Sequence, residues 1–183
     1  MSKIALIIID MQNDYFPAGK WPLEGIDAAA ANAARVLAHF REHKLPVVHV
    51  RHEFLSDDAP FFTPGSDGAN IHDSLQPAEA EFRVLKNGVN SFNGTELQAL
   101  LQREGISALV IVGAMSHMCI DAVARAAADL GYSNTLLHDA CATLDMEFNG
   151  VKVPAAQVHA AFMAALAFAY AEVIATDEFL ARQ

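Results

Sequence analysis

Short apolar runs alternate with longer helical stretches along the chain, and this alternation constrains the fold most strongly. Six runs are candidate strands: Ile4–Ile9, Val47–Arg51, Arg83–Leu85, Leu109–Gly113, Asn134–His138 and Glu172–Ala175. Four of them consist almost entirely of β-branched or aliphatic residues, as is typical of strands that are covered on both faces. Helices are predicted over Asp27–His43, Thr95–Glu104, Met118–Leu130 and Ala155–Ala169. The alternation predicts an α/β fold with a mainly parallel sheet.

Length and charge narrow the class of protein further. A chain of 183 residues suits one compact domain over residues 1–183. The formal net charge of −10 disfavours nucleic acid and membrane surfaces as partners, because both attract basic patches. No apolar stretch reaches the roughly 20 residues that a membrane span needs. Two cysteines make no disulfide framework, so we expect a reducing, cytoplasmic location.

Three polar residues are predicted to lie at one edge of the sheet. Asp10 directly follows the first apolar run, Lys86 ends the third, and Cys119 lies in the turn between the fourth run and a helix. The carboxyl ends of parallel strands line the ligand crevice of such sheets. A nucleophile, a base and a cation together form a generalised catalytic triad. Each residue also has a structural explanation, as a turn cap, a surface lysine or a buried thiol.

The position of Cys119 favours a reactive thiol. A helix N-terminus stabilises an anion, so we expect it to lower the pKa of this cysteine. The same N–H groups could stabilise an oxyanion. Cys141 follows the fifth run without a clear helix start behind it, and we interpret it as structural or pocket-lining. The alternative function is a redox-sensing or otherwise non-catalytic thiol protein, which would need neither Asp10 nor Lys86.

Three ordered motifs give the sequence a recognisable resemblance. The first motif runs from Ala5 to Phe16 (ALIIIDMQNDYF), the second from Lys86 to Phe92 (KNGVNSF), and the third from Val112 to Ala122 (VGAMSHMCIDA). With these motifs the chain resembles the isochorismatase-like cysteine hydrolases, a family that includes nicotinamidases and N-carbamoylsarcosine amidases. The resemblance covers nearly the whole chain.

The resemblance implies a fold and a mechanism. The family fold is a three-layer α/β/α sandwich around a six-stranded, mainly parallel sheet in the order 3-2-1-4-5-6. A cis peptide bond is implied at Ala114–Met115, with the backbone N–H groups of Met115 and Cys119 as the oxyanion hole. The implied reaction is hydrolysis of a small-molecule amide, ureido or related C–N bond through a thioester on Cys119, with Asp10 and Lys86 completing the catalytic triad. No cofactor is implied.

A metal ion is not expected. Nicotinamidases of this family bind a divalent metal through an Asp-x-His pair after the second strand, with another histidine downstream. The corresponding region here reads His49-Val50-Arg51-His52-Glu53-Phe54, so the pair is absent. His52, Glu53 and His72 could in principle bind an ion, but their spacing is not that of the family. This departure also lowers the expectation of nicotinamidase activity.

The substrate pocket is predicted from position alone. The segment from His52 to Glu81 follows no clear period, so it is either a functional loop or a surface loop whose phenylalanines return to the core. The candidate substrate-binding residues are Gln12, Phe16, His52, Phe61, Phe62, Phe92 and His117. The resemblance also implies a homo-oligomer, a dimer or tetramer, in which a neighbouring subunit could complete the pocket.

Overall fold

A six-stranded parallel sheet forms the centre of the molecule. The computed structural model describes residues 3–56 and 58–182. The strands of this sheet are β1 (Lys3–Ile9), β2 (Val47–His52), β3 (Phe82–Lys86), β4 (Ile106–Ala114), β5 (Ser133–Ala142) and β8 (Glu172–Ile174). Their order is β3-β2-β1-β4-β5-β8, and all neighbours are parallel. This confirms the predicted order, with β8 as the sixth strand.

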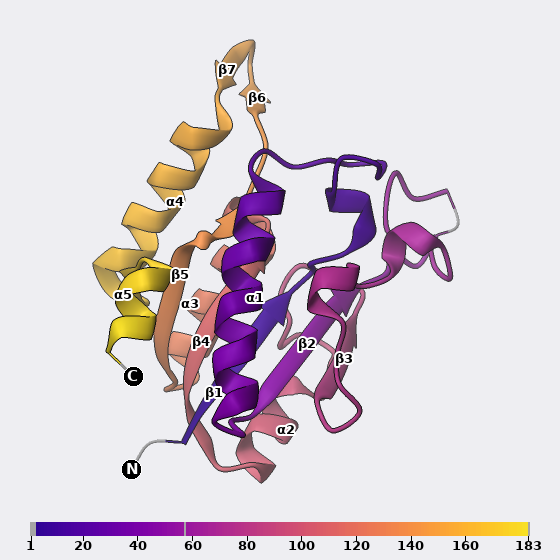
Figure 1. The fold of residues 1–183 in the computed structure, drawn as a ribbon. Helices are drawn as coiled ribbons and strands as arrows, with labels where there is room; N and C mark the ends of the chain where they lie inside the picture. Colours follow the sequence, from indigo (N-terminus) through magenta and orange to yellow (C-terminus); the bar gives the residue numbers. More distant parts are fainter. Residues whose placement is uncertain (1–2, 57, 183) are drawn as a thin grey trace.

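Helices cover both faces of the sheet (Figure 1). Alternate residues of β1 supply two hydrophobic cores, as the two-residue period of a strand requires. Leu6 and Ile8 pack in the core that contains α1 (Ile26–Glu42) and α5 (Thr176–Ala181). Ile7 and Ile9 pack in the core on the other face. That face is covered by α2 (Leu97–Arg103), α3 (Asp121–Asp129) and α4 (Ala155–Ala169). The three-layer α/β/α architecture is therefore confirmed.

The fourth helix, α4, is unusual because it carries no charged residue. Val158, Met163 and Leu166 are buried, while most of the outer face is alanine and Phe168 is 91% exposed. An apolar helix normally buries its surface. Among the described residues, no helix combines the length and the hydropathy that crossing a membrane requires.

A short hairpin that was not predicted precedes α4. Its strands are β6 (Met146–Phe148) and β7 (Val151–Val153), and it projects beyond the rest of the molecule in Figure 1. Asn149 and Gly150 join the strands with φ values of 50° and 78°. Two positive φ values in succession fit the type I′ turn that an Asn-Gly pair favours. Phe148 is 76% exposed at its tip, so the hairpin extends the apolar surface of α4.

Strand register sets the positions of the site residues. Ile9 pairs with Val50 on one side and with Gly113 on the other. Gly113 has a φ of 133°, and a Cβ there would overlap the carbonyl of Ile9. Only glycine therefore allows β4 to approach β1 so closely beside Asp10. On the other side, His52 of β2 pairs with Lys86 of β3.

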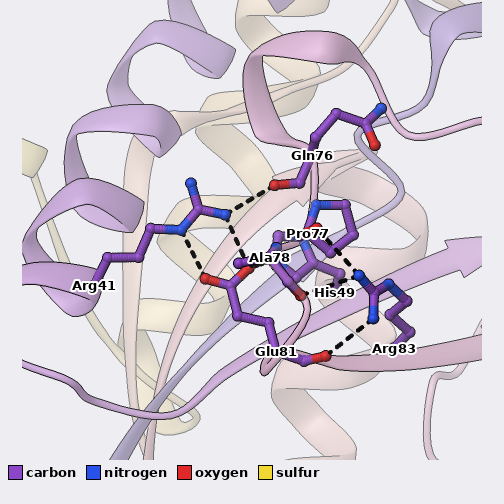
Figure 2. Close-up of polar contacts among 7 residues, drawn as sticks. All are labelled: Arg41, His49, Gln76, Pro77, Ala78, Glu81 and Arg83. Carbon is purple, nitrogen blue, oxygen red and sulfur yellow. Dashed lines mark hydrogen bonds and ion pairs between the residues drawn. The ribbon is translucent and has the colours of Figure 1, made fainter.

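The start of β3 is anchored by a partly buried carboxylate, Glu81 (Figure 2). Its oxygens accept hydrogen bonds from Arg41 on α1 at 2.7 and 2.9 Å and lie 2.9 Å from His49 Nε2 on β2. The backbone N–H of Ala78 donates a further bond at 2.7 Å. Burial alone would raise the pKa of Glu81, but these partners lower it to about 2. The anchored carboxylate ties β3, and hence Lys86 at its other end, to α1 and β2.

A fully buried carboxylate, that of Asp14, organises the irregular segment that follows β2. Asp14 lies in the 3-10 turn η1 (Asn13–Tyr15) and accepts hydrogen bonds from the backbone N–H groups of Phe62 at 2.7 Å and Lys20 at 3.1 Å. Gly68 lies so close to this carboxylate that a Cβ would overlap it. Two further 3-10 turns, η2 (Asp67–Ala69) and η3 (Asp73–Leu75), follow. The segment is thus held against the edge of the sheet where β1 and β2 end.

Candidate active site

Asp10, Lys86 and Cys119 meet at the carboxyl edge of the sheet. Asp10 follows β1, Lys86 is the last residue of β3, and Cys119 lies in a π-helical turn, η4 (Ser116–Ile120), between β4 and α3. They are 0%, 1% and 4% exposed. Lys86 Nζ lies 2.8 Å from Asp10 Oδ2 and 3.2 Å from Cys119 Sγ. The structure therefore brings together the three residues that the sequence placed at one edge.

The backbone of Asp10 turns out of the strand at this point. Its φ is 52°, in the left-handed region that costs a non-glycine residue about 1 kcal/mol. The Asp10 N–H donates to Val50 O at 2.9 Å, and the Asp10 carbonyl accepts from the Gln12 N–H at 2.9 Å. These bonds hold the strained residue in place. Such strain concentrates at functional sites.

The ammonium group of Lys86 uses all three of its N–H donors and is also ion-paired with Asp10. Besides Asp10 and Cys119, its Nζ lies 3.0 Å from His52 Nδ1 and 3.0 Å from the carbonyl oxygen of Gly88. An ammonium group carries three N–H donors. His52, Gly88 and Cys119 take one hydrogen bond each, whereas Asp10 Oδ2 is held by the ion pair alone among the described residues.

Burial changes the acid–base properties of the site. Burial and the nearby Asp10 carboxylate raise the pKa of Cys119, and Lys86 only partly opposes this. The expectation that a helix N-terminus lowers this pKa was therefore wrong. Burial lowers the pKa of Lys86, but Asp10 and Cys119 outweigh it, so the net shift is upward. The resting site holds an aspartate–lysine ion pair beside a protonated thiol.

Comparison with known proteins identifies the family. The model of the isochorismatase domain matches residues 4–178. The chain belongs to the isochorismatase family. It is 48% identical over 176 residues to the uncharacterized isochorismatase family protein YddQ of Bacillus subtilis, covering 96% of this chain and 98% of YddQ.

Two further relatives show how widely this similarity extends. A crystal structure from Oleispira antarctica, assigned to isochorismatase hydrolases, is 61% identical with a TM-score of 0.95, covering 98% of this chain and 97% of the other. Streptothricin hydrolase of Streptomyces noursei is 33% identical over 151 residues, covering 78% of this chain and 50% of that protein. Members of the isochorismatase family thus include hydrolases.

The turn that carries Cys119 has two uncommon backbone features. The peptide bond between Ala114 and Met115 is cis. The carbonyl of Met115 accepts hydrogen bonds from the N–H groups of Met118 at 3.0 Å and Ile120 at 3.2 Å. These bonds close η4 into a π-helical turn, a form that is frequent at functional sites.

The residues considered for metal binding lie apart. His72 stacks on Phe16 and contacts Ser74, and Glu53 pairs with Arg51 at 3.0 Å. One other set, Asp10, His52 and Cys119, has ligand atoms within 4.8 Å of one another. The ammonium of Lys86 lies at 2.8–3.2 Å from a ligand atom of each of them. A metal ion would have to displace this cation, so the set does not fit one, and the absence of a metal stays a prediction.

Gln12 and Phe16, two of the predicted substrate-binding residues, have other partners. The Gln12 amide donates to the carbonyls of His52 and Ala69, both at 2.8 Å, and accepts from the His52 N–H at 2.7 Å. Both of its N–H groups are thereby used. Phe16 stacks on His72 at 3.6 Å between ring centroids. Gln12 therefore acts on the backbone of His52, and Phe16 packs with the loop.

The other candidates lie at different distances from the triad. His52 contacts Lys86 directly, and its ring lies 6.1 Å from that of Phe62. Phe61 packs 4.9 Å from Trp21, and Phe92 lies 6.1 Å from Tyr132. His117 Nδ1 lies 2.6 Å from Thr143 Oγ1. Of the seven predicted residues, the structure joins His52 to the triad by a direct polar contact.

Tyr15 is a site residue that the sequence analysis missed. It is buried, and its ring lies 4.5 Å from that of Phe62. Burial raises the pKa of Tyr15, and the nearby Asp10 carboxylate raises it further. The sequence could have indicated this role, because Tyr15 belongs to the same motif as Asp10 and Gln12.

Proposed function

We propose that the protein is a cysteine hydrolase that cleaves a small-molecule amide, ureido or related C–N bond through a thioester. The observation that carries the proposal is the position of the Lys86 ammonium between Asp10 Oδ2 at 2.8 Å and Cys119 Sγ at 3.2 Å. A base, a nucleophile and a cation at these distances supply the groups that such a reaction needs.

The reaction divides into acylation and deacylation. Asp10 accepts the proton of the Cys119 thiol, and the sulfur attacks the substrate carbonyl. The N–H groups of Met115 and Cys119 stabilise the oxyanion. The C–N bond then breaks, the leaving nitrogen takes the proton from Asp10, and a thioester remains. Water, giving its proton to Asp10, cleaves the C–S bond, the acid leaves, and the thiol regains its proton.

The state of the thiol argues for this mechanism over redox sensing. Redox-sensor cysteines are accessible and have a low pKa. Cys119 is buried, and burial with the Asp10 charge raises its pKa. Such a thiol needs a base at the moment of attack, and Asp10 is in place to act as one. Hydrolase relatives in the family, including streptothricin hydrolase, add support.

A panel of primary amides and ureido compounds, scored for ammonia release, tests the proposal. We expect the wild-type chain to hydrolyse at least one compound and Cys119→Ala to hydrolyse none. Cys141→Ala is the matched control, because Cys141 is also a buried, unpaired cysteine. Its activity should stay near the wild-type value. Equal background rates for wild type and Cys119→Ala across the panel would remove the hydrolase assignment.

We further propose that the protein assembles with a second copy of itself through α4 and the β6–β7 hairpin. The outer face of α4 is uncharged, and the hairpin adds exposed Met146, Phe148 and Val151 beside it. The chain has a formal net charge of −10. Two copies would repel each other across most surfaces, but the outer face of α4 can bury apolar area without bringing like charges together, and the two charges of the hairpin, Glu147 and Lys152, are paired with opposite sign.

A further inference from the structure

Two histidines lie one turn apart at the C-terminal end of α1. His39 is in the last turn of the helix, and His43 is the residue that caps it. Side chains at i and i+4 share one face of a helix, and a pair of histidines at this spacing is an arrangement that binds zinc in other helices. The two ring centroids are 4.2 Å apart, and the rings are inclined at 35°. His43 is exposed and His39 is partly exposed, so two imidazoles lie side by side at the surface.

A hydrogen bond to the backbone fixes the proton of the His43 ring. Nδ1 of His43 lies 2.9 Å from the carbonyl oxygen of His39. A carbonyl oxygen only accepts, so Nδ1 carries a proton and donates it. In the neutral ring, Nε2 therefore keeps its lone pair and can bind a metal ion. Histidines that bind metals commonly donate their other ring N–H to a carbonyl or a carboxylate in this way.

The ring of His39 is restricted by aromatic neighbours. It lies edge-on to Phe40, with 6.1 Å between centroids, and edge-on to Phe179 of α5 at 6.3 Å. A side chain that is already restricted loses less rotamer freedom when it binds a ligand. The pair therefore combines one held ring with one exposed ring whose free nitrogen is defined.

The surroundings of the pair favour a cation. The last turn of a helix carries partial negative charge on its free carbonyl groups, and the whole chain has a formal net charge of −10. Arg41, which lies between the two histidines in the sequence, is paired with Glu81 at 2.7 Å. The guanidinium charge of Arg41 is therefore partly neutralised beside the pair.

The pair lies far from the catalytic triad in the fold. The last residue of α1 is Glu42, and β2 begins at Val47, so the pair lies near the edge of the sheet where strands begin (Figure 1). The triad lies at the opposite edge, where strands end. A metal ion at the pair is thus independent of the catalytic residues, which do not fit one.

We propose that His39 and His43 bind one divalent transition-metal ion of the class that imidazole prefers, which includes Cu²⁺, Ni²⁺ and Zn²⁺. Water fills the remaining coordination positions. The ion joins the last turn of α1 to the residue that caps it. Arg41 of this turn holds Glu81 at the start of β3, so metal binding stabilises the folded chain where α1 supports the sheet.

Isothermal titration calorimetry of the untagged chain with nickel chloride tests the site. We expect one Ni²⁺ to bind, Co²⁺ to bind more weakly, and Mg²⁺ not to bind, because Mg²⁺ prefers oxygen ligands. His39→Ala and His43→Ala should each weaken Ni²⁺ binding about 100-fold, since one imidazole remains without the second contact. His72→Ala is the matched control, because it removes another partly exposed histidine and should leave the Kd unchanged.

The melting temperature gives a second measurement. Ni²⁺ should raise it in the wild type and in His72→Ala but not in His43→Ala. Equal Ni²⁺ affinity in the wild type and both α1 variants would overturn the proposal, and so would Mg²⁺ binding as tight as that of Ni²⁺, which would indicate carboxylate ligands.

A double variant tests the spacing itself. Combining His43→Ala with Lys44→His keeps the number of histidines but moves one of them off the shared face of the helix. It should bind Ni²⁺ no more tightly than His43→Ala, and wild-type affinity in the double variant would contradict the chelate. These measurements need no substrate, so they stand whether or not the chain hydrolyses an amide.

Discussion

Asp10 combines a left-handed backbone with a carboxylate that is buried against Lys86. The sequence predicted Asp10, Lys86 and Cys119 at one edge, because each comes at or after the end of an apolar run. Burial was not readable from the sequence, and it reverses the expected direction of the Cys119 pKa. Tyr15 was missed because an aromatic residue beside a strand is most simply interpreted as part of the core.

The substitution Asp10→Asn tests whether Asp10 is the catalytic base. The substitution keeps the shape of the side chain and removes both proton acceptance and the counter-charge of Lys86. We expect kcat to fall by about 10²–10⁴-fold. Leaving Lys86 buried without its partner should also lower the free energy of unfolding by roughly 3 kcal/mol. Turnover of a responsive amide and urea unfolding give the two values, and full activity would rule out Asp10 as the base.

The strands of the central sheet were predictable because each is a short run of apolar residues in the sequence. Asn134–His138 was predicted as the fifth strand, whereas β5 continues to Ala142 beyond a shift in its register with β4. The β6–β7 hairpin was not predicted, although the Asn149-Gly150 pair is a strong local signal for such a turn. Its strands have three residues each, too few for a visible alternation. The segment after β2 depends on long-range bonds to Asp14, which no local pattern encodes.

Gly113→Ala tests the close approach of β4 to β1. The new Cβ would overlap the carbonyl of Ile9, and the φ of 133° is strained for alanine. We expect the free energy of unfolding to fall by about 2 kcal/mol or more and turnover to fall as Asp10 shifts. Gly88→Ala is the matched control, since no atom lies within 4 Å of its Cβ position. Equal melting temperatures for the two variants would contradict the explanation.

The molecule as a whole is expected to lose stability on acidification, before its carboxylates titrate. The pKa values of His49, His52 and His117 are all lowered, chiefly by burial. An unfolded histidine titrates near pH 6.5. Below that pH the unfolded chain binds more protons than the folded one, so stability is full above about pH 6.5 and falls towards pH 4.

Calorimetry at pH 7 and pH 5 measures this acid loss. The melting temperature should be lower at pH 5, and His52→Asn should show a smaller difference between the two values, because one of the responsible groups is gone. Glu81 has a pKa lowered to about 2, so it should not contribute at pH 5. An unchanged melting temperature at pH 5 would mean that the buried histidines accept protons without cost.

Self-association is also a property of the whole molecule. If α4 packs on a second copy, sedimentation should give a mass that is a multiple of 19.7 kDa. Ala164→Glu puts a charge on the outer face of α4 and should shift the protein to monomer. Ala38→Glu makes the same change at an exposed position of α1 and should leave the mass unchanged. A wild-type monomer, or equal behaviour of the two variants, would remove α4 as the interface.

The depth of the thiol has a consequence for how the protein is found in labelling surveys. Cys119 is 4% exposed, so a reagent can reach only a small part of its surface. The size of a covalent probe should therefore limit its rate of reaction with Cys119 more than its electrophilicity does. We expect a small haloacetamide to label Cys119 faster than a bulky maleimide, so surveys built on large thiol tags would undercount this protein in a mixed proteome.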